Sequence, residues 1–97
     1  LVLVSSANMK PYDSVATRGG PARAQENGVA IAYANPVGSD GTFDYCGLSC
    51  ICDASGTDLA RAGTVPALIY ADITRGDVTR VRDDLDYLSQ TRTELYT

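Results

Sequence analysis

Three cysteines that lie close together, Cys46, Cys50 and Cys52, are the residues whose types and spacing most suggest chemistry. Clustered thiols can supply a nucleophile, bind a metal ion or form a redox pair. The chain contains no histidine, so it cannot itself provide a Cys-His nucleophile pair. A structural zinc site normally takes four protein ligands, and three thiols fall short of that number. We therefore expect buried, reduced, structural cysteines, with a thiol metal or redox site as the weaker alternative.

Other polar residues stand where chemistry could occur. Asn8 follows an apolar run, at the strand end where α/β folds bind ligands; alternatively it caps its own backbone in a turn. Asn35 also follows an apolar run and could contact a substrate or close a structural turn. Glu26 could be a general base or could pair with Arg23. Ser49 lacks the Gly-x-Ser-x-Gly context of a nucleophile, so we expect an ordinary strand residue.

The first half of the chain predicts a strand, a helix and a second strand. Apolar residues favour buried strands over Leu1–Ser6, apolar on both faces, and over Val29–Ala34. Between them, Ala22–Asn27 contains good helix formers. The Gly19-Gly20-Pro21 sequence should break any earlier helix, because glycine is unfavourable there and proline suits a first helical position. Gly28 is a plausible helix stop.

The second half predicts a hairpin, a strand and a last helix. We expect a strand over 43–53, a turn over 54–56 and its partner strand over 57–62. A further strand is expected over Ala67–Ile73. Asp77 would cap the last helix, whose apolar stripe is Val78, Val81, Leu85 and Leu88. This order is an α/β pattern with one parallel pair of strands, helices on one side and a bare opposite face.

Bulk properties limit the partners. The chain has 97 residues and a net charge of −4, which is the size of one domain or part of one. This charge disfavours nucleic acid and anionic membrane surfaces as partners. Apolar stretches are too short for a membrane span, and unpaired cysteines favour a cytoplasmic location. Because Leu1–Val4 opens the chain on an apolar run, we expect it to be a piece of a larger protein.

Several ordered segments resemble the C-terminal portion of the nitrilase superfamily of carbon–nitrogen hydrolases. The helix Ala22–Asn27 resembles the family's Arg-Ala-x-Glu-Asn motif, and 32–35 resembles its strand ending in Asn. The remaining matches are the opening strand and loop 1–13, the Gly-x-Ser strand 45–49, the Asp-x-x-Gly turn 53–56 and the closing Arg-Arg-x-Glu-Leu-Tyr tail at 91–96. The loop 7–13 and Tyr45-Cys46-Gly47 look closest to bacterial aliphatic amidases of the 5-aminopentanamidase type.

The resemblance implies a fold and a mechanism. Residues 1–97 would form the C-terminal part of a carbon–nitrogen hydrolase domain with an α-β-β-α sandwich. The family's Glu-Lys-Cys triad, which attacks an amide or nitrile through a cysteine thiolate, would precede Leu1. No residue of this chain would be catalytic, and no cofactor or metal is expected. Ala7, Asn8 and Met9 would line the substrate pocket.

The resemblance also concerns assembly. The helix Ala22–Asn27 resembles one at the family's dimer surface, so a homo-oligomer is expected, although ordinary packing of this helix on the sheet is the alternative. The partners would then be a small amide or nitrile and a missing N-terminal segment. A competing interpretation is a non-catalytic remnant or interaction module that keeps this fold pattern.

Overall fold

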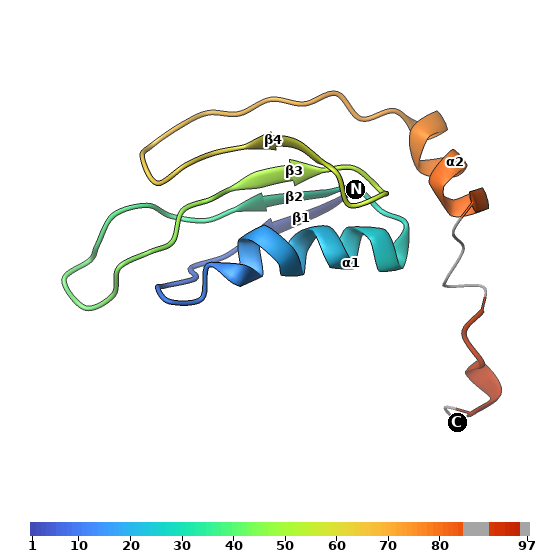
Figure 1. The fold of residues 1–97 in the computed structure, drawn as a ribbon, viewed down its shortest axis with the longest axis horizontal. Coiled ribbons are helices and arrows are strands. Elements are labelled where there is room, and N and C mark those ends of the chain that lie inside the picture. Colours follow the sequence, from blue (N-terminus) through green and yellow to red (C-terminus); the bar gives the residue numbers. More distant parts are fainter. Residues whose placement is uncertain (85–89, 96–97) are drawn as a thin grey trace.

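The computed structural model describes residues 1–84 and 90–95 (Figure 1). Within these residues, four strands form one sheet with the order β1-β2-β3-β4. The elements are, in chain order, β1 (Val2–Ser5), the π-helical turn η1 (Val15–Gly19), α1 (Gly20–Asn27), β2 (Ile31–Ala34), β3 (Cys50–Cys52), β4 (Asp58–Arg61), α2 (Arg75–Asp84) and the 3-10 turn η2 (Thr93–Leu95).

The sheet combines one parallel pair with an antiparallel hairpin. β1 and β2 are parallel and are joined by the helical segment, whereas β2–β3 and β3–β4 are antiparallel. The register sets Ile31 opposite Cys52 and Tyr33 opposite Cys50, so these four side chains share one face. α1 lies along that face (Figure 1), and Ala24 of α1 is fully buried there. The predicted α/β fold and the buried Cys50 and Cys52 are confirmed.

The opposite face of the sheet has little cover. Leu3 is 76% exposed, and Ala32 and Ile51 on the same face are only half-buried. β1 is the predicted strand, but its predicted burial on both faces is wrong. β1 forms the edge of the sheet, and within the described residues no second layer covers Leu1, Val2 and Leu3, which are all exposed.

The predicted break at Gly19-Gly20-Pro21 is wrong, because helical structure continues from η1 directly into α1. The N–H of Gly20 donates to the carbonyl of Val15, five residues back, which widens the turn. Pro21 then falls in the first turn of α1, where a missing N–H costs little. Gly28 ends the helix in the left-handed conformation at φ 59°, as predicted.

Two strand predictions fail in different ways. The predicted strand over 43–53 shrinks to β3, because Gly47 and Leu48 have φ of 64° and 61°, outside the extended region. The predicted strand over Ala67–Ile73 is wrong: in the described part of the chain, no strand forms there. The segment runs past the sheet as an extended trace (Figure 1). The hairpin prediction holds, since β4 lies within 57–62 and pairs with β3.

The last helix begins earlier than predicted. Thr74 Oγ1 accepts the N–H of Asp77 at 3.1 Å, so Thr74 is the cap and Asp77 lies in the first turn of α2. Arg82 Nε donates to the carbonyl of Gly28 at 2.9 Å and links α2 to the end of α1. Leu85 and Leu88 of the predicted stripe lie outside the described residues. Among the described helices, none has the length and hydropathy needed to cross a membrane.

Candidate functional site

The loop that follows β1 meets the end of β2. The two strands run parallel, with Ser5 paired to Ala34, so their carboxyl ends lie at one edge of the sheet, where α/β folds bind ligands. Ala7 in this loop is exposed, whereas Asn8 and Met9 are half-buried. Met9 forms an isolated antiparallel bridge with Tyr45. The three predicted pocket residues therefore lie together at this edge.

Asn35 holds the backbone of Asn8 from both sides. The Asn35 side chain accepts the Asn8 N–H at 2.8 Å and donates through Nδ2 to the Asn8 carbonyl at 3.2 Å. Nδ2 also donates to the carbonyl of Gly47 at 3.0 Å. Because its amide group is committed inside the chain, Asn35 has the structural role that we weighed against substrate contact.

The Asn8 side chain also has a fixed partner. Its Nδ2 donates to the hydroxyl of Tyr33 at 2.5 Å. In the described part of the chain, no backbone N–H donates to Asn8 Oδ1, so the alternative in which Asn8 caps its own backbone is not what forms. Tyr33 is buried in β2. Within the described residues, no partner is found for Asn8 Oδ1, which leaves an amide oxygen able to accept a hydrogen bond from a ligand.

Ser49 holds the backbone of Asn35 in place. Its Oγ accepts the Asn35 N–H at 2.8 Å and donates to the Asn35 carbonyl at 3.2 Å. It lies just before β3 and is not an ordinary strand residue. Sequence reasoning did not assign these roles to Ser49 and Tyr33. The tyrosine carried a usable signal, because a tyrosine at an inward position of an apolar strand normally needs a partner for its hydroxyl.

Cys46 lies beside the same loop. Its N–H donates to the Asn8 carbonyl at 3.0 Å, and its thiol contacts Asp13 Oδ1 at 3.5 Å. Burial raises the pKa of the Cys46 thiol, and the nearby Asp13 carboxylate raises it further. A thiol held in its neutral form is a poor nucleophile and a poor metal ligand.

Cys50 and Cys52 are equally unsuited to chemistry. Both are buried free thiols in the core beneath α1, and burial is the main cause that raises the pKa of each. In the described part of the chain, no cluster of three acidic, cysteine or histidine side chains could hold a metal ion. The prediction of buried structural cysteines is confirmed.

Glu26 does not belong to this group. It is exposed on α1 and pairs with Arg23 at 2.6 Å, as we expected of a structural residue. Both side chains are more than half exposed, so the pair contributes about 0.5 kcal/mol at most.

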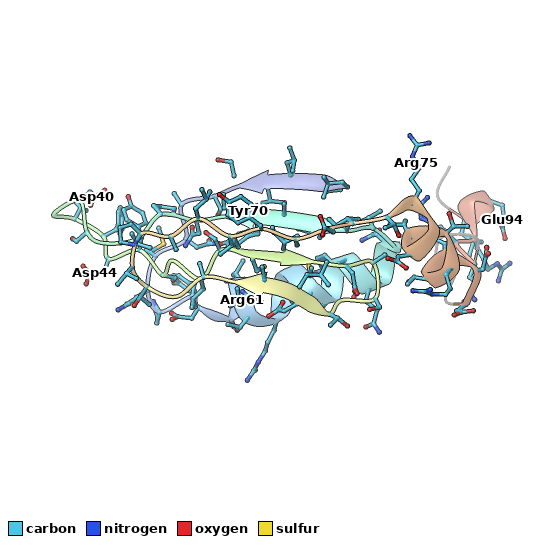
Figure 2. The ribbon with its side chains drawn as sticks, turned by 90° about the horizontal axis from the view of Figure 1, so that it is seen from above. Asp40, Asp44, Arg61, Tyr70, Arg75 and Glu94 are labelled. Carbon is cyan, nitrogen blue, oxygen red and sulfur yellow. The ribbon has the colours of Figure 1, made fainter. Side chains whose placement is uncertain are left out.

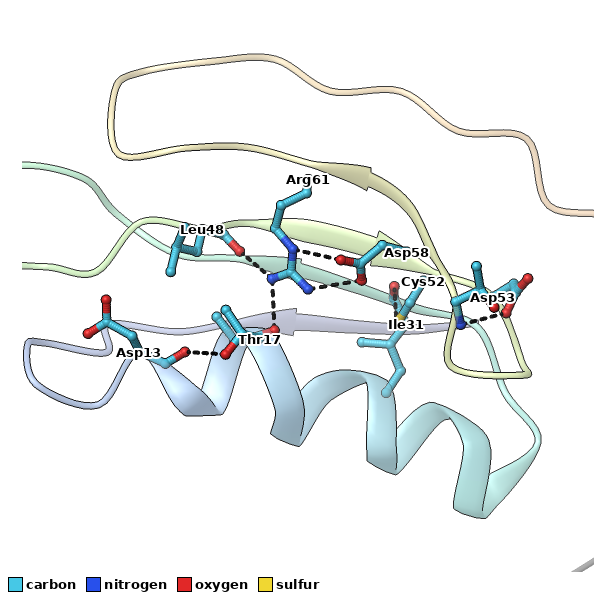
Figure 3. Close-up of polar contacts among 10 residues, drawn as sticks. Asp13, Thr17, Ile31, Leu48, Cys52, Asp53, Asp58 and Arg61 are labelled. Carbon is cyan, nitrogen blue, oxygen red and sulfur yellow. Dashed lines mark hydrogen bonds and ion pairs between the residues drawn. The ribbon is translucent and has the colours of Figure 1, made fainter.

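Arg61 of β4 is a positioning group that sequence reasoning missed (Figure 3). Its Nη1 donates to the carbonyls of Ala16 at 2.8 Å and Leu48 at 2.9 Å. Its Nε and Nη2 donate to the two carboxylate oxygens of Asp58. It thereby joins η1 to the segment that precedes β3. No local pattern announces such a contact, because Ala16 and Arg61 are far apart in the chain.

Comparison with known protein families shows which family the chain belongs to. The family model described as "Carbon-nitrogen hydrolase" matches residues 5–83. The chain belongs to the carbon–nitrogen hydrolase family. The match begins at the last residue of β1 and covers the Asn8 loop, β2, β3, β4 and most of α2.

Individual relatives agree with this assignment. The chain is 44% identical over 96 residues to "Hydrolase in pqqF 5'region" of Pseudomonas protegens, covering 99% of this chain and 34% of that protein. It is 35% identical over 77 residues to "Omega-amidase NIT2" of Mus musculus, covering 78% of this chain and 28% of that protein. The chain thus spans about a third of the length of these two relatives.

Solved structures extend the agreement to the fold. A variant of the amidase from Nesterenkonia sp. AN1, described as showing covalent addition of the acetamide moiety of fluoroacetamide at the active site cysteine, aligns with a TM-score of 0.79 and 34% identity, covering 98% of this chain and 34% of that one. Another structure of this amidase, which is described as belonging to the nitrilase superfamily, aligns with a TM-score of 0.78 and 33% identity at the same coverage. The chain therefore has the α/β fold of nitrilase-superfamily amidases.

Proposed function

We propose that this chain is the C-terminal part of an amidase that hydrolyses small aliphatic amides. The single observation that carries the proposal is the anchored Asn8 loop, which presents the oxygen Asn8 Oδ1 at a strand-end edge in a chain with amidase relatives. An amide substrate carries an N–H₂ group that such an acceptor can bind. Ala7, Asn8 and Met9 form one wall of the proposed pocket.

The catalytic triad is proposed to lie outside this chain. The three thiols here are buried with raised pKa values, which argues against any of them as the nucleophile. In the proposed reaction, an external cysteine thiolate attacks the amide carbon, the C–N bond breaks and protonated nitrogen leaves as ammonia. Water then hydrolyses the thioester to the carboxylic acid and restores the thiol. A glutamate acts as general base and a lysine stabilises the oxyanion.

The sparsely covered face of the sheet, opposite α1, supports the proposal that a further segment packs on it. Ala67, Leu68 and Ile69 pass over that face and border an open cavity of about 410 Å³ with Leu3 and Ile51. Leu3 and Leu68 are each 76% exposed, and apolar patches of this kind are usually covered in the working protein. We propose that the segment bearing the nucleophile packs here and completes one domain with residues 1–97.

Assembly and location are part of the same proposal. The outer side of α1 carries exposed Arg23 and Glu26, and we propose it as a homo-oligomer surface. Free buried thiols fit a reducing cytoplasm. If α1 lies in the interface, Arg23→Glu should lower the mass of the oligomer measured by light scattering. An unchanged mass would show that α1 is not part of the interface.

The proposed function is tested with a hybrid enzyme. In the Pseudomonas protegens hydrolase, the matched third of the protein is replaced by this chain. Ammonia release is measured with butyramide, acrylamide, 5-aminopentanamide and butyronitrile as substrates. We expect release from the amides and little from the nitrile, with 5-aminopentanamide preferred if the subtype resemblance holds. Asn8→Ala should lower kcat/KM about 10- to 100-fold, whereas Glu26→Gln should not.

Two controls make this result decisive. The unmodified Pseudomonas protein reports whether the assay works, and a melting curve reports whether the hybrid folds. A folded hybrid that releases no ammonia would contradict the proposed function and favour a non-catalytic remnant. Activity that survives Asn8→Ala unchanged would remove Asn8 from the pocket.

A further inference from the structure

Asn35 combines burial with bonds to two separate segments. In the described part of the chain it is the single buried polar residue, with 8% of its surface exposed. Its side chain bonds both backbone groups of Asn8 and the carbonyl of Gly47. This arrangement needs one acceptor and two N–H donors on one short side chain, which asparagine supplies and aspartate does not.

The Asn8 loop has few other anchors near its centre. Before Asn8, the Ser6 N–H donates to the Ala34 carbonyl, and after it the Lys10 N–H donates to the Asp44 carbonyl. Between these points, the backbone of Asn8 is held by Asn35 and by the N–H of Cys46. The position of Asn8 therefore depends on Asn35 more than on any regular ladder of strand hydrogen bonds.

The side chain of Asn8 is oriented by a second contact. Its Nδ2 donates to the Tyr33 hydroxyl, which directs this end of the amide toward β2. The result is that Oδ1, and not Nδ2, is the atom left to meet a ligand. Backbone and side chain of Asn8 are thus set by separate residues, Asn35 and Tyr33.

We propose that Asn35 is a positioning residue, which acts through Asn8 to hold the acceptor Asn8 Oδ1 toward the amide nitrogen of the substrate. This inference rests on the proposed function. It assigns Asn35 no contact with substrate. Ser49 assists by fixing the backbone of Asn35.

The test uses the hybrid enzyme with butyramide. Asn35→Ala removes all three side-chain bonds, and Asn35→Asp keeps the shape but loses the donors. We expect kcat/KM to fall roughly 10-fold or more in both variants, but no further than in Asn8→Ala, mainly through a rise in KM, since misplacing a binding group can lower the rate by up to about 100-fold. Cys52→Ala is the matched control, because it truncates a buried side chain of β3 away from the loop. It should lower the melting temperature and leave KM within about twofold of the unmodified hybrid.

Hydrogen exchange supplies a readout that does not depend on activity. Exchange of the peptide spanning 6–13, followed by mass spectrometry, should accelerate in Asn35→Ala and remain unchanged in Cys52→Ala. Unchanged exchange in Asn35→Ala, or faster exchange with an unchanged KM, would overturn the positioning role. If the folded reference hybrid is inactive, the proposed function fails, and with it the substrate-directed role; the exchange result then decides separately whether Asn35 holds the loop.

Discussion

Arg61 donates a hydrogen bond from Nη1 to the carbonyl oxygen of Ala16 at 2.8 Å (Figure 3). The carbonyl needs this donor for a local reason. The N–H of Gly20 is taken by Val15 in the widened turn, and the next residue, Pro21, has no N–H to offer. A residue of β4 thus completes the hydrogen bonding of η1. The helix can pass through Gly19-Gly20-Pro21 because the sheet supplies what the proline lacks.

Arg61→Met should destabilise the fold by about 1–3 kcal/mol. The substitution keeps most of the aliphatic bulk but leaves the carbonyls of Ala16 and Leu48 without their donor. Urea unfolding of the chain, followed by circular dichroism, measures the change. Arg80→Met is the control, because its pair with Asp77 is exposed and should contribute less than about 0.5 kcal/mol. Equal effects of the two variants would contradict the role of Arg61.

Two glycines should respond to alanine in opposite directions. Gly20 has helical angles, φ −58° and ψ −56°, and an added Cβ would lie 3.9 Å from its nearest neighbour. Gly20→Ala should therefore stabilise by about 0.4–1 kcal/mol, by restricting the unfolded chain. Gly56 has φ +86°, and its Cβ would lie 2.7 Å from the Pro21 carbonyl oxygen, so Gly56→Ala should destabilise by more than about 1 kcal/mol. Melting temperatures of both variants check the contrast.

The parts of the fold that follow from local sequence could be predicted, and those that depend on distant partners could not. β2, the end of α1 at Gly28 and the β3–β4 hairpin each follow from short-range patterns. Continuation of the helix through Pro21 depends on Arg61, far along the chain. β3 is short because Leu48 adopts a positive φ, which a leucine seldom does and no composition rule indicates.

The candidate site divides in the same way. Asn8 could be picked out because it follows an apolar strand, and strand ends bind ligands in α/β folds. Its partners Asn35 and Tyr33 come from the end of β2, and only the tertiary structure brings them to it. Ser49, from a third segment, bonds the backbone of Asn35. The sequence identifies Asn35 as a strand-end residue. No sequence pattern indicates that its side chain bonds both the N–H and the carbonyl of Asn8.

The three thiols should be protected in the folded chain. Cys46, Cys50 and Cys52 are each at most 1% exposed, and burial raises the pKa of all three. Reaction with a thiol-specific disulfide reagent at neutral pH should be roughly 100-fold slower than in the urea-unfolded chain, which serves as the control. Rapid reaction of one thiol in the native state would identify it as accessible and contradict its structural assignment.

Asp40 organises the loop between β2 and β3, which lies at the end of the molecule opposite α2 (Figure 2). Its Oδ1 accepts the N–H groups of Phe43 at 2.8 Å and Thr42 at 2.9 Å, and its Oδ2 accepts the hydroxyl of Tyr45 at 2.7 Å. These bonds, led by that from Phe43, lower the pKa of Asp40 from 3.8 to about 2.

The lowered pKa of Asp40 fixes the direction of a pH effect. Between about pH 4 and pH 2 the unfolded chain binds the proton and the folded chain does not, so stability rises with pH in this window. The contribution of Asp40 is complete above about pH 4 and is lost as the pH falls through about 2. Nuclear magnetic resonance titration of the Asp40 carboxyl carbon should give a midpoint near 2. Tyr45→Phe removes one of the three bonds and should raise that midpoint, whereas an unmoved midpoint would show that the Tyr45 hydroxyl does not stabilise the carboxylate.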